Sequence, residues 1–233
     1  MVDLSDEIAE LWEALGSPGA AGARVIQVVA ARRGEGASSV ARALAAHACR
    51  SALRSVWLVD LDILAGAQFS ALSGEEAHYG KLGPAASASP DGSMFFTLRP
   101  TALSAARTPI ADAKYLSAHQ VGDARWWVTR FQSERLQPGQ NLHVIGDPAY
   151  WSTLRRHVDV IIVDCPSLDR SGAALTLAKN MDQTVIVVAA DEVDVRPPAM
   201  LRDALVEAGA SVSGLFVNRA GMAPALKQKS QRR

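Results

Sequence analysis

The sequence predicts an α/β fold with a doubly wound, mostly parallel sheet and helices on both faces of that sheet. Two observations support this prediction. Several short runs are apolar throughout, as in parallel strands that are covered on both faces, and helical segments lie between them. The chain has 233 residues, of which 48% are hydrophobic, so it is long enough for one sizeable domain of this class.

An amphipathic helix is predicted near the N-terminus, over residues 5–15, with Ser5 as its N-cap. Its apolar face is formed by Ile8, Leu11, Trp12 and Leu15. The sequence GSPGAAG then ends the helix and acts as a linker. Two interpretations of the apolar face stay open: it packs on the chain's own domain, or it contacts a partner. We expect this helix and linker over 1–22 and a single domain over 23–233.

The remaining elements alternate along the chain. Strands are predicted at residues 24–30, 55–60, 158–164, 184–190 and 213–218. Helices are predicted at residues 39–50, 172–180 and 198–208. This alternation is what a doubly wound sheet requires, because each parallel strand needs a crossover connection to the next.

The segment 64–140 is atypical, since it is rich in Ala, Ser and Gly and carries no clear strand signal. One helix is predicted in it, capped by Asp123 and stopped by Pro138-Gly139. The apolar stripe of this helix consists of Ala124, Trp127, Val128 and Phe131. Trp126 falls outside the stripe and has two interpretations, packing at an edge of its own domain or exposure as an anchor for a partner.

Composition excludes several classes of function. The formal net charge is zero, which gives no electrostatic argument for nucleic-acid binding. The two cysteines, Cys49 and Cys165, form no disulfide framework and fit a reducing cytoplasm. The first residues do not read as a signal peptide, and no apolar run approaches the roughly 20 residues of a membrane span. We therefore predict a cytoplasmic protein without direct membrane insertion.

The stretch AARRGEGASSVARALAAHA, residues 30–48, has the pattern of a phosphate-binding loop. Glycines let successive backbone N–H groups point inward, and the following helix adds its positive end. Gly34 and Gly36 would supply this curl, and Ser38 stands where a hydroxyl holds magnesium. The position that requires lysine is occupied by Ala37. On the loop alone, an ordinary tight turn between strand and helix remains an alternative.

Carboxylates end two of the predicted strands. Asp60 and Asp62 follow the strand at 55–60, and Asp164 ends the strand at 158–164. Open α/β sheets bind ligands at the carboxyl ends of their strands, so these acids and the loop are expected to lie together. Acids at strand ends are commonly solvated, and a purely structural role predicts that these carboxylates face water.

These motifs resemble the deviant Walker P-loop group that includes MinD and ParA. They resemble most of all the bacterial tyrosine kinases of capsule and exopolysaccharide systems, of the CpsD, CapB and Wzc type. The matching stretches are RRGEGASS, WLVDLD, VIIVDCPS and LRDALVEAGASVSGLFVNR. The resemblance leaves out the middle segment, and it implies a sheet of the P-loop NTPase type that binds ATP or ADP with magnesium.

The resemblance also implies roles for single residues. Ser38 and Asp164 take the magnesium positions, and the vestigial catalytic acids are Asp60 and Asp62. Arg32 stands in place of the signature lysine that reaches a partner subunit's phosphates. The nucleotide-binding positions that follow are Arg32, Gly34, Glu35, Gly36, Ala37, Ser38, Ser39, Asn218 and Arg219.

Several departures from the family pattern occur together. The loop lysine is Ala37, and Leu64 stands where the second acidic motif normally continues to an arginine. The final residues, LKQKSQRR, contain no tyrosine that could accept phosphate. The ring-assembly pattern Glu-x-x-Arg-x-x-Arg does not occur in the sequence. Losing a cation over the transferred phosphate typically costs 100-fold or more in rate, so the departures indicate a degenerate, non-catalytic protein.

Two functions are therefore predicted as alternatives. In the first, the chain is a pseudokinase or pseudo-ATPase of exopolysaccharide biosynthesis and export, bound peripherally to the inner membrane through a polysaccharide copolymerase (chain-length protein). Nucleotide and magnesium binding would then be weak or absent. In the second, the chain is an active MinD/ParA-type ATPase in positioning or regulation, for which an ATP-dependent homodimer is expected.

Overall fold

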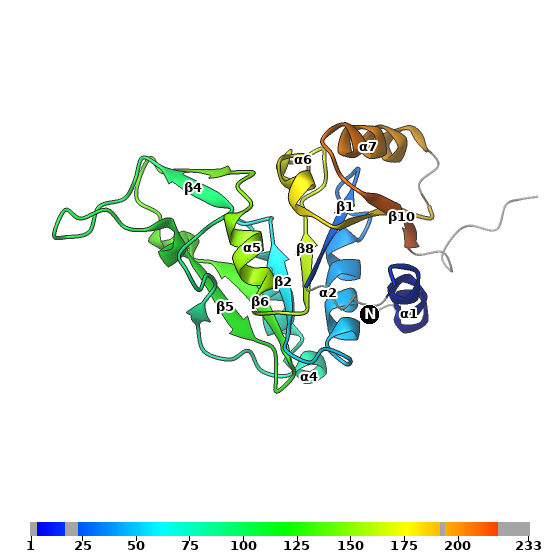
Figure 1. The fold of residues 1–233 in the computed structure, drawn as a ribbon, viewed down its shortest axis with the longest axis horizontal. Coiled ribbons are helices and arrows are strands. Elements are labelled where there is room, and N and C mark those ends of the chain that lie inside the picture. Colours follow the sequence, from blue (N-terminus) through cyan, green and yellow to red (C-terminus); the bar gives the residue numbers. More distant parts are fainter. Residues whose placement is uncertain (1–3, 17–22, 192–193, 219–233) are drawn as a thin grey trace, which may run out of the picture.

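The computed structural model describes residues 4–16, 23–191 and 194–218 and contains one large sheet and one small sheet (Figure 1). The strands are β1 (Arg24–Ala30), β2 (Val56–Asp60), β3 (Ala86–Ser87), β4 (Phe96–Arg99), β5 (Leu116–Gln120), β6 (Trp126–Phe131), β7 (Asn141–Val144), β8 (Val160–Asp164), β9 (Gln183–Ala189) and β10 (Val212–Asn218). The α-helices are α1 (Ser5–Ala14), α2 (Ala37–Ala48), α3 (Ala67–Gly74), α4 (Glu76–Tyr79), α5 (Ala149–Arg155), α6 (Ala173–Leu177) and α7 (Arg196–Glu207). The predicted linker at 17–22 and the tail from 219 lie outside the described residues.

The large sheet has the strand order β10-β9-β1-β8-β2-β6-β5-β3. The pairs from β10 to β6 are parallel, while β5 and β3 run antiparallel to their neighbours. Strands β4 and β7 form the separate two-stranded antiparallel sheet. The predicted α/β class, with a mostly parallel sheet, is therefore confirmed.

Helices cover both faces of the large sheet because the inner strands are apolar on both sides. Along β1, Val25 and Val29 pack in the core beneath α5, α6 and α7. The alternate residues Ile26 and Val28 pack in a second core with α1 and α2. All five predicted strands are present, as β1, β2, β8, β9 and β10, and the predicted helices correspond to α1, α2, α6 and α7.

The helix predicted after Asp123 is wrong, because residues Trp126–Phe131 form strand β6. β6 pairs in parallel with β2 and antiparallel with β5, so the middle segment extends the main sheet. Its apolar residues satisfy a helical stripe and a strand alternation equally well. β-branched and aromatic residues favour the strand, and pairing with β2 buries both of its faces.

Trp126 packs inside the domain, where its side chain is 2% exposed and its ring lies 5.7 Å from that of Tyr79. The neighbouring Trp127 points to the opposite face, as strand geometry requires, and stacks on Trp57 at 6.2 Å. Packing within the domain is thus the correct interpretation of Trp126, and a buried ring of this kind does not anchor a partner.

The first helix also packs on its own domain. Ile8 of α1 is 1% exposed against α2, and the Trp12 ring lies 6.2 Å from that of His47. The Arg24 guanidinium lies 4.9 Å from the centre of the Trp12 ring and donates to the Leu15 carbonyl at 2.7 Å. The N-cap is Leu4 rather than Ser5, which is the first residue of the helix. Among the described helices, none has the length and hydropathy needed to cross a membrane.

Candidate functional site

The loop between β1 and α2 has the backbone curl of a phosphate-binding loop. Gly34 and Gly36 both adopt left-handed conformations, with φ of +91° and +96°, which glycine adopts without strain. Gly36 directly precedes the 12-residue helix α2, so the loop faces the positive end of a full helix dipole. Inside the loop, the backbone N–H of Arg32 donates to Oε2 of the buried Glu35 at 2.8 Å.

The end of β10 holds this loop in place. Nδ2 of Asn218 donates to the Glu35 carbonyl at 2.9 Å, and the Asn218 side chain is buried. A Cβ on Gly36 would stand 2.0 Å from the same Nδ2. The close approach of Asn218 therefore requires glycine at position 36. Asn218, assigned to the base by resemblance, is engaged with the loop backbone.

The two strand-end acids lie side by side, since Asp60 and Asp164 are register partners in neighbouring strands. They are only 4% and 1% exposed, so the expectation that they face water is wrong. Burial raises the pKa of both carboxyl groups, and the charge of Asp164 raises the pKa of Asp60 further. Asp62 differs from them, because it pairs at the surface with Arg170 at 2.5 Å.

Gln68, at the start of α3, joins these groups, and sequence reasoning missed it. Its side chain is completely buried and its Nε2 donates to Oδ2 of Asp164 at 2.6 Å and to the Ser38 carbonyl at 2.8 Å. Its backbone N–H donates to Oδ2 of Asp60 at 2.9 Å. The Gln68 amide therefore joins Asp164 to the backbone of Ser38, while the Ser38 side chain itself hydrogen-bonds Asp164. No local sequence pattern marks this glutamine.

The residues present fit a magnesium–nucleotide complex only in part. The curl remains, and Oδ1 of Asp164 is a buried oxygen without a hydrogen-bond partner, which favours a cation. However, Ala37 supplies no charge for the outer phosphates, and the Gln68 amide donates to the carboxylate that would bind the metal. No group of three or more His, Cys, Asp or Glu side chains among the described residues could hold a metal. The lysine side of the site therefore lacks the charge that the resemblance implies, whereas the Ser38 and Asp164 side keeps the oxygen groups of the expected metal position.

The remaining predicted residues lie around the loop. Nη2 of Arg32 is 3.4 Å from Asp194, so this guanidinium contacts an acid of its own chain. Ser39 is exposed on α2, one residue beyond Ser38. Leu64, at the missing arginine position, is 62% exposed. Arg219 lies outside the described residues.

The two buried acids are expected to respond differently to amidation. Both oxygens of Asp60 accept hydrogen bonds from backbone N–H groups, one from Asp62 and one from Gln68. In Asp60→Asn an NH₂ group replaces one of these oxygens, so it faces a backbone N–H and that hydrogen bond is lost. We expect this to lower the free energy of unfolding by about 1–3 kcal/mol. Asp164→Asn keeps an acceptor for Gln68, and we expect a change within about 1 kcal/mol at pH 7.

The pH dependence has a definite sign. A carboxyl group whose pKa is raised by folding stabilises the protein below its unfolded pKa, and this contribution is lost as pH rises through the folded pKa. Urea denaturation from pH 4 to pH 8 should therefore show the wild type losing stability relative to Asp164→Asn. A wild type that gains stability relative to this variant over the same range would contradict the buried, raised-pKa assignment.

Comparison with known proteins finds similar structures but no similar sequence. No protein-family model and no curated protein sequence matches the chain significantly. The kinase domain of the Escherichia coli tyrosine kinase ETK superposes with a TM-score of 0.56 at 16% identity, over 93% of this chain and 76% of that one. The match to ETK covers the middle segment, which the sequence resemblance left out.

Two further proteins share this fold. The MinD cell division protein of Aquifex aeolicus gives a TM-score of 0.50 at 15% identity, over 84% of this chain and 69% of that one. Cobyrinic acid a,c-diamide synthase from Mycobacterium smegmatis, solved with bound ADP and magnesium, also gives 0.50 at 15% identity, over 83% and 72%. At identities this low, the structural similarity establishes the fold alone.

Proposed function

Because the chain has the fold of bacterial tyrosine kinase domains and of MinD, we propose that it is a non-catalytic relative of those kinases, a pseudokinase. In this proposal it acts in exopolysaccharide biosynthesis and export, as a cytoplasmic partner of an inner-membrane polysaccharide copolymerase. ATP or ADP and magnesium bind weakly or not at all. The protein reaches the membrane only through its partner.

One observation carries the non-catalytic part of this proposal. The Gln68 amide lies between Ser38 and Asp164, while Ala37 occupies the lysine position. Phosphoryl transfer depends on positive charge at the transferred phosphate, supplied by lysine and magnesium. Here a neutral amide engages one oxygen of Asp164 on the metal side of the site, and position 37 carries no charge. The loop remains as a rigid element of the fold.

The alternative is an active ATPase of the MinD/ParA type. It is favoured by the intact glycine curl and by the unpartnered Oδ1 of Asp164, which a metal could use. In that case Gln68 would have to leave Asp164 when nucleotide binds. Magnesium-dependent turnover that disappears in Asp164→Ala would establish this alternative.

The partner is tested by affinity purification of the full chain from membranes of its native host. The proposal expects a polysaccharide copolymerase to be recovered, and recovered equally by Asp164→Asn, because the contact does not require nucleotide. Recovery of division or partition proteins without a copolymerase would favour the alternative.

Tyrosine phosphorylation is expected to be absent. Tyr115 and Tyr150 are 2% and 1% exposed, and Tyr79 is half-buried against Trp126. Burial keeps the hydroxyls of Tyr115 and Tyr150 from an active site, Tyr79 is fixed in a helix, and the sequence contains no other tyrosine. Mass spectrometry of protein from the native host should find no stoichiometric phosphotyrosine, and its presence at any of the three positions would overturn this expectation.

A further inference from the structure

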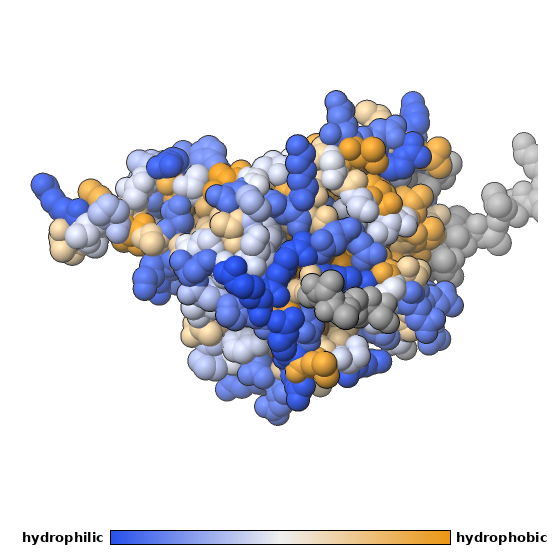
Figure 2. All heavy atoms as spheres, viewed as in Figure 1, coloured by the Kyte–Doolittle hydropathy of each residue, from blue (hydrophilic) through white to orange (hydrophobic). Residues whose placement is uncertain are grey.

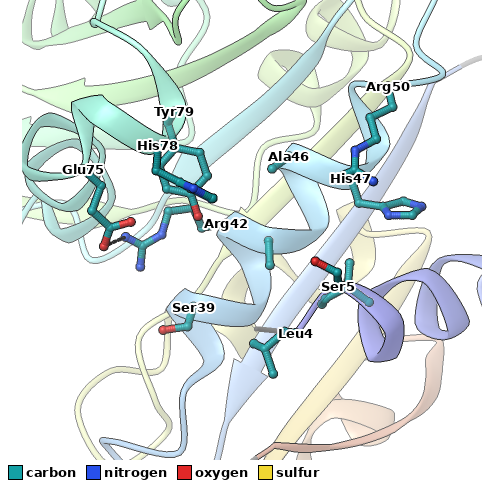
Figure 3. A pocket seen from close by; sticks show the side chains of 12 residues that line it. Leu4, Ser5, Ser39, Arg42, Ala46, His47, Arg50, Glu75, His78 and Tyr79 are labelled. Carbon is teal, nitrogen blue, oxygen red and sulfur yellow. Dashed lines mark ion pairs between the residues drawn. The ribbon is translucent and has the colours of Figure 1, made fainter. Parts of the chain in front are cut away.

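A cavity of about 470 Å³ lies between α1, α2 and the segment 75–79 (Figure 3). It adjoins the loop site, since Ser39 lines it and the charge of Arg42 acts against the rise in the pKa of Asp164. This volume is within the range of small-molecule sites. Ile8, Ala43 and Ala46 give the cavity an apolar lining. Figure 3 shows Arg42, Glu75, His78 and Tyr79 at one end and His47 with Arg50 at the other.

The charged side chains of the cavity are mainly cationic. Arg42 and Arg50 are opposed by a single acid, Glu75, whose Oε1 lies 3.9 Å from Nη1 of Arg42. That distance is too long for a hydrogen bond. In the part of the chain that the structure describes, Arg50 forms no ion pair. His47 and His78 also line the cavity, and burial together with the charge of Arg50 lowers the pKa of His47.

Arg42 is the cation of the cavity that lacks a hydrogen-bond acceptor. Its side chain is only 12% exposed, yet its Nη1 is buried without a hydrogen-bond partner. Other arginines of the fold donate directly to carboxylates, as Arg155 does to Asp182 and Arg54 to Asp159. A mostly buried guanidinium without a hydrogen-bonded acid is costly, and an anionic ligand would supply the missing oxygens.

The spacing on α2 indicates the shape of such a ligand. Arg42 and Ala46 are one turn apart on the same face of α2, and Arg50 lies two residues beyond the end of that helix, at the other end of the cavity. The helix face between the two cations is apolar. An anionic group bound at one guanidinium would therefore leave the rest of its molecule on Ala43, Ala46 and Ile8.

We propose that this cavity binds an organic phosphate, a molecule with a phosphate group and a compact apolar or aromatic body. Guanidinium groups match phosphate oxygens in pairs, which favours phosphate as the anion. The apolar lining then selects an ester over the inorganic ion. The cavity adjoins the loop site through Ser39 and Arg42, but its apolar lining and Arg50 lie outside the loop, so binding there does not depend on the proposed function.

Isothermal titration of the full chain with 1-naphthyl phosphate tests the proposal. We expect saturable binding to one site, and binding of inorganic phosphate weaker by about tenfold or more. Arg50→Glu, a charge reversal at an exposed position, should weaken the ester by about tenfold or more. Arg42→Gln should weaken it as well, with circular dichroism showing that both variants are folded.

Arg33→Glu is the matched control, because Arg33 is also exposed but lies on the phosphate-type loop. It should leave the affinity for 1-naphthyl phosphate unchanged. The absence of saturable binding would overturn the proposal, and so would equal affinity for inorganic phosphate. Binding that Arg33→Glu weakens and Arg50→Glu does not would place the ligand at the loop and equally overturn it.

Discussion

Ala37→Lys alone is expected to bind magnesium–ATP as poorly as the wild type, whereas Ala37→Lys combined with Gln68→Ala is expected to bind it at least about tenfold more tightly. The lysine restores the charge that the loop lacks. It does not free Asp164, because Nε2 of Gln68 still donates to Oδ2 of that carboxylate at 2.6 Å. Removing the amide opens the position next to Ser38, where a metal would bind.

Titration with a fluorescent ATP analogue, with and without magnesium, measures this effect. Gln137→Ala in the Ala37→Lys background is the control, because Gln137 is exposed and bonds only to surface backbone. Tight magnesium–ATP binding by the wild type, or its full recovery by Ala37→Lys alone, would show that Gln68 does not block the site.

Trp126→Ala is expected to lower the free energy of unfolding by about 3–5 kcal/mol. The side chain is 2% exposed in the core where α3 packs on β6, beside the ring of Tyr79 of α4, so its removal leaves a large cavity. Trp127→Ala should cost less, about 1–3 kcal/mol, because Trp127 is only half-buried on the other face of β6. Chemical denaturation of both variants measures the difference.

This pair of variants separates the two structures that the sequence allowed for the segment. The predicted helix would have buried Trp127 on its stripe and left Trp126 off it. Strand β6 reverses that order. A larger loss for Trp127→Ala than for Trp126→Ala would contradict the strand.

The parallel strands could be predicted because their residues are apolar on both faces, which only a covered inner strand requires. RVIQVVA, for example, became β1 at the predicted boundaries. The middle segment could not be predicted in the same way. In WWVTRF the helical and the strand period fit the same apolar residues, and only pairing with β2 decides between them. The face of the molecule drawn in Figure 2 mixes hydrophilic and hydrophobic side chains.

The candidate site was predictable where it follows the backbone. Gly34 and Gly36 indicated the curl, and the order of the strands brought Asp60 and Asp164 together. Their burial could not be foreseen, because it depends on α3 covering the strand ends. Gln68 belongs to that cover, and a glutamine in a Gly- and Ala-rich stretch carries no chemical signature of its own. Contacts between residues distant in sequence, rather than motifs, therefore determine whether this loop can bind magnesium and nucleotide.

Polysaccharide output in cells carrying Asp164→Asn distinguishes a non-catalytic protein from one that needs a working nucleotide site. This change removes the carboxylate that magnesium would need and, by the hydrogen bonds it keeps, leaves the fold near its normal stability. The amount of protein is measured in parallel. If the protein is non-catalytic, we expect exopolysaccharide output close to that of the wild type. Loss of output at an unchanged protein level would contradict it and show that the site holds metal and nucleotide.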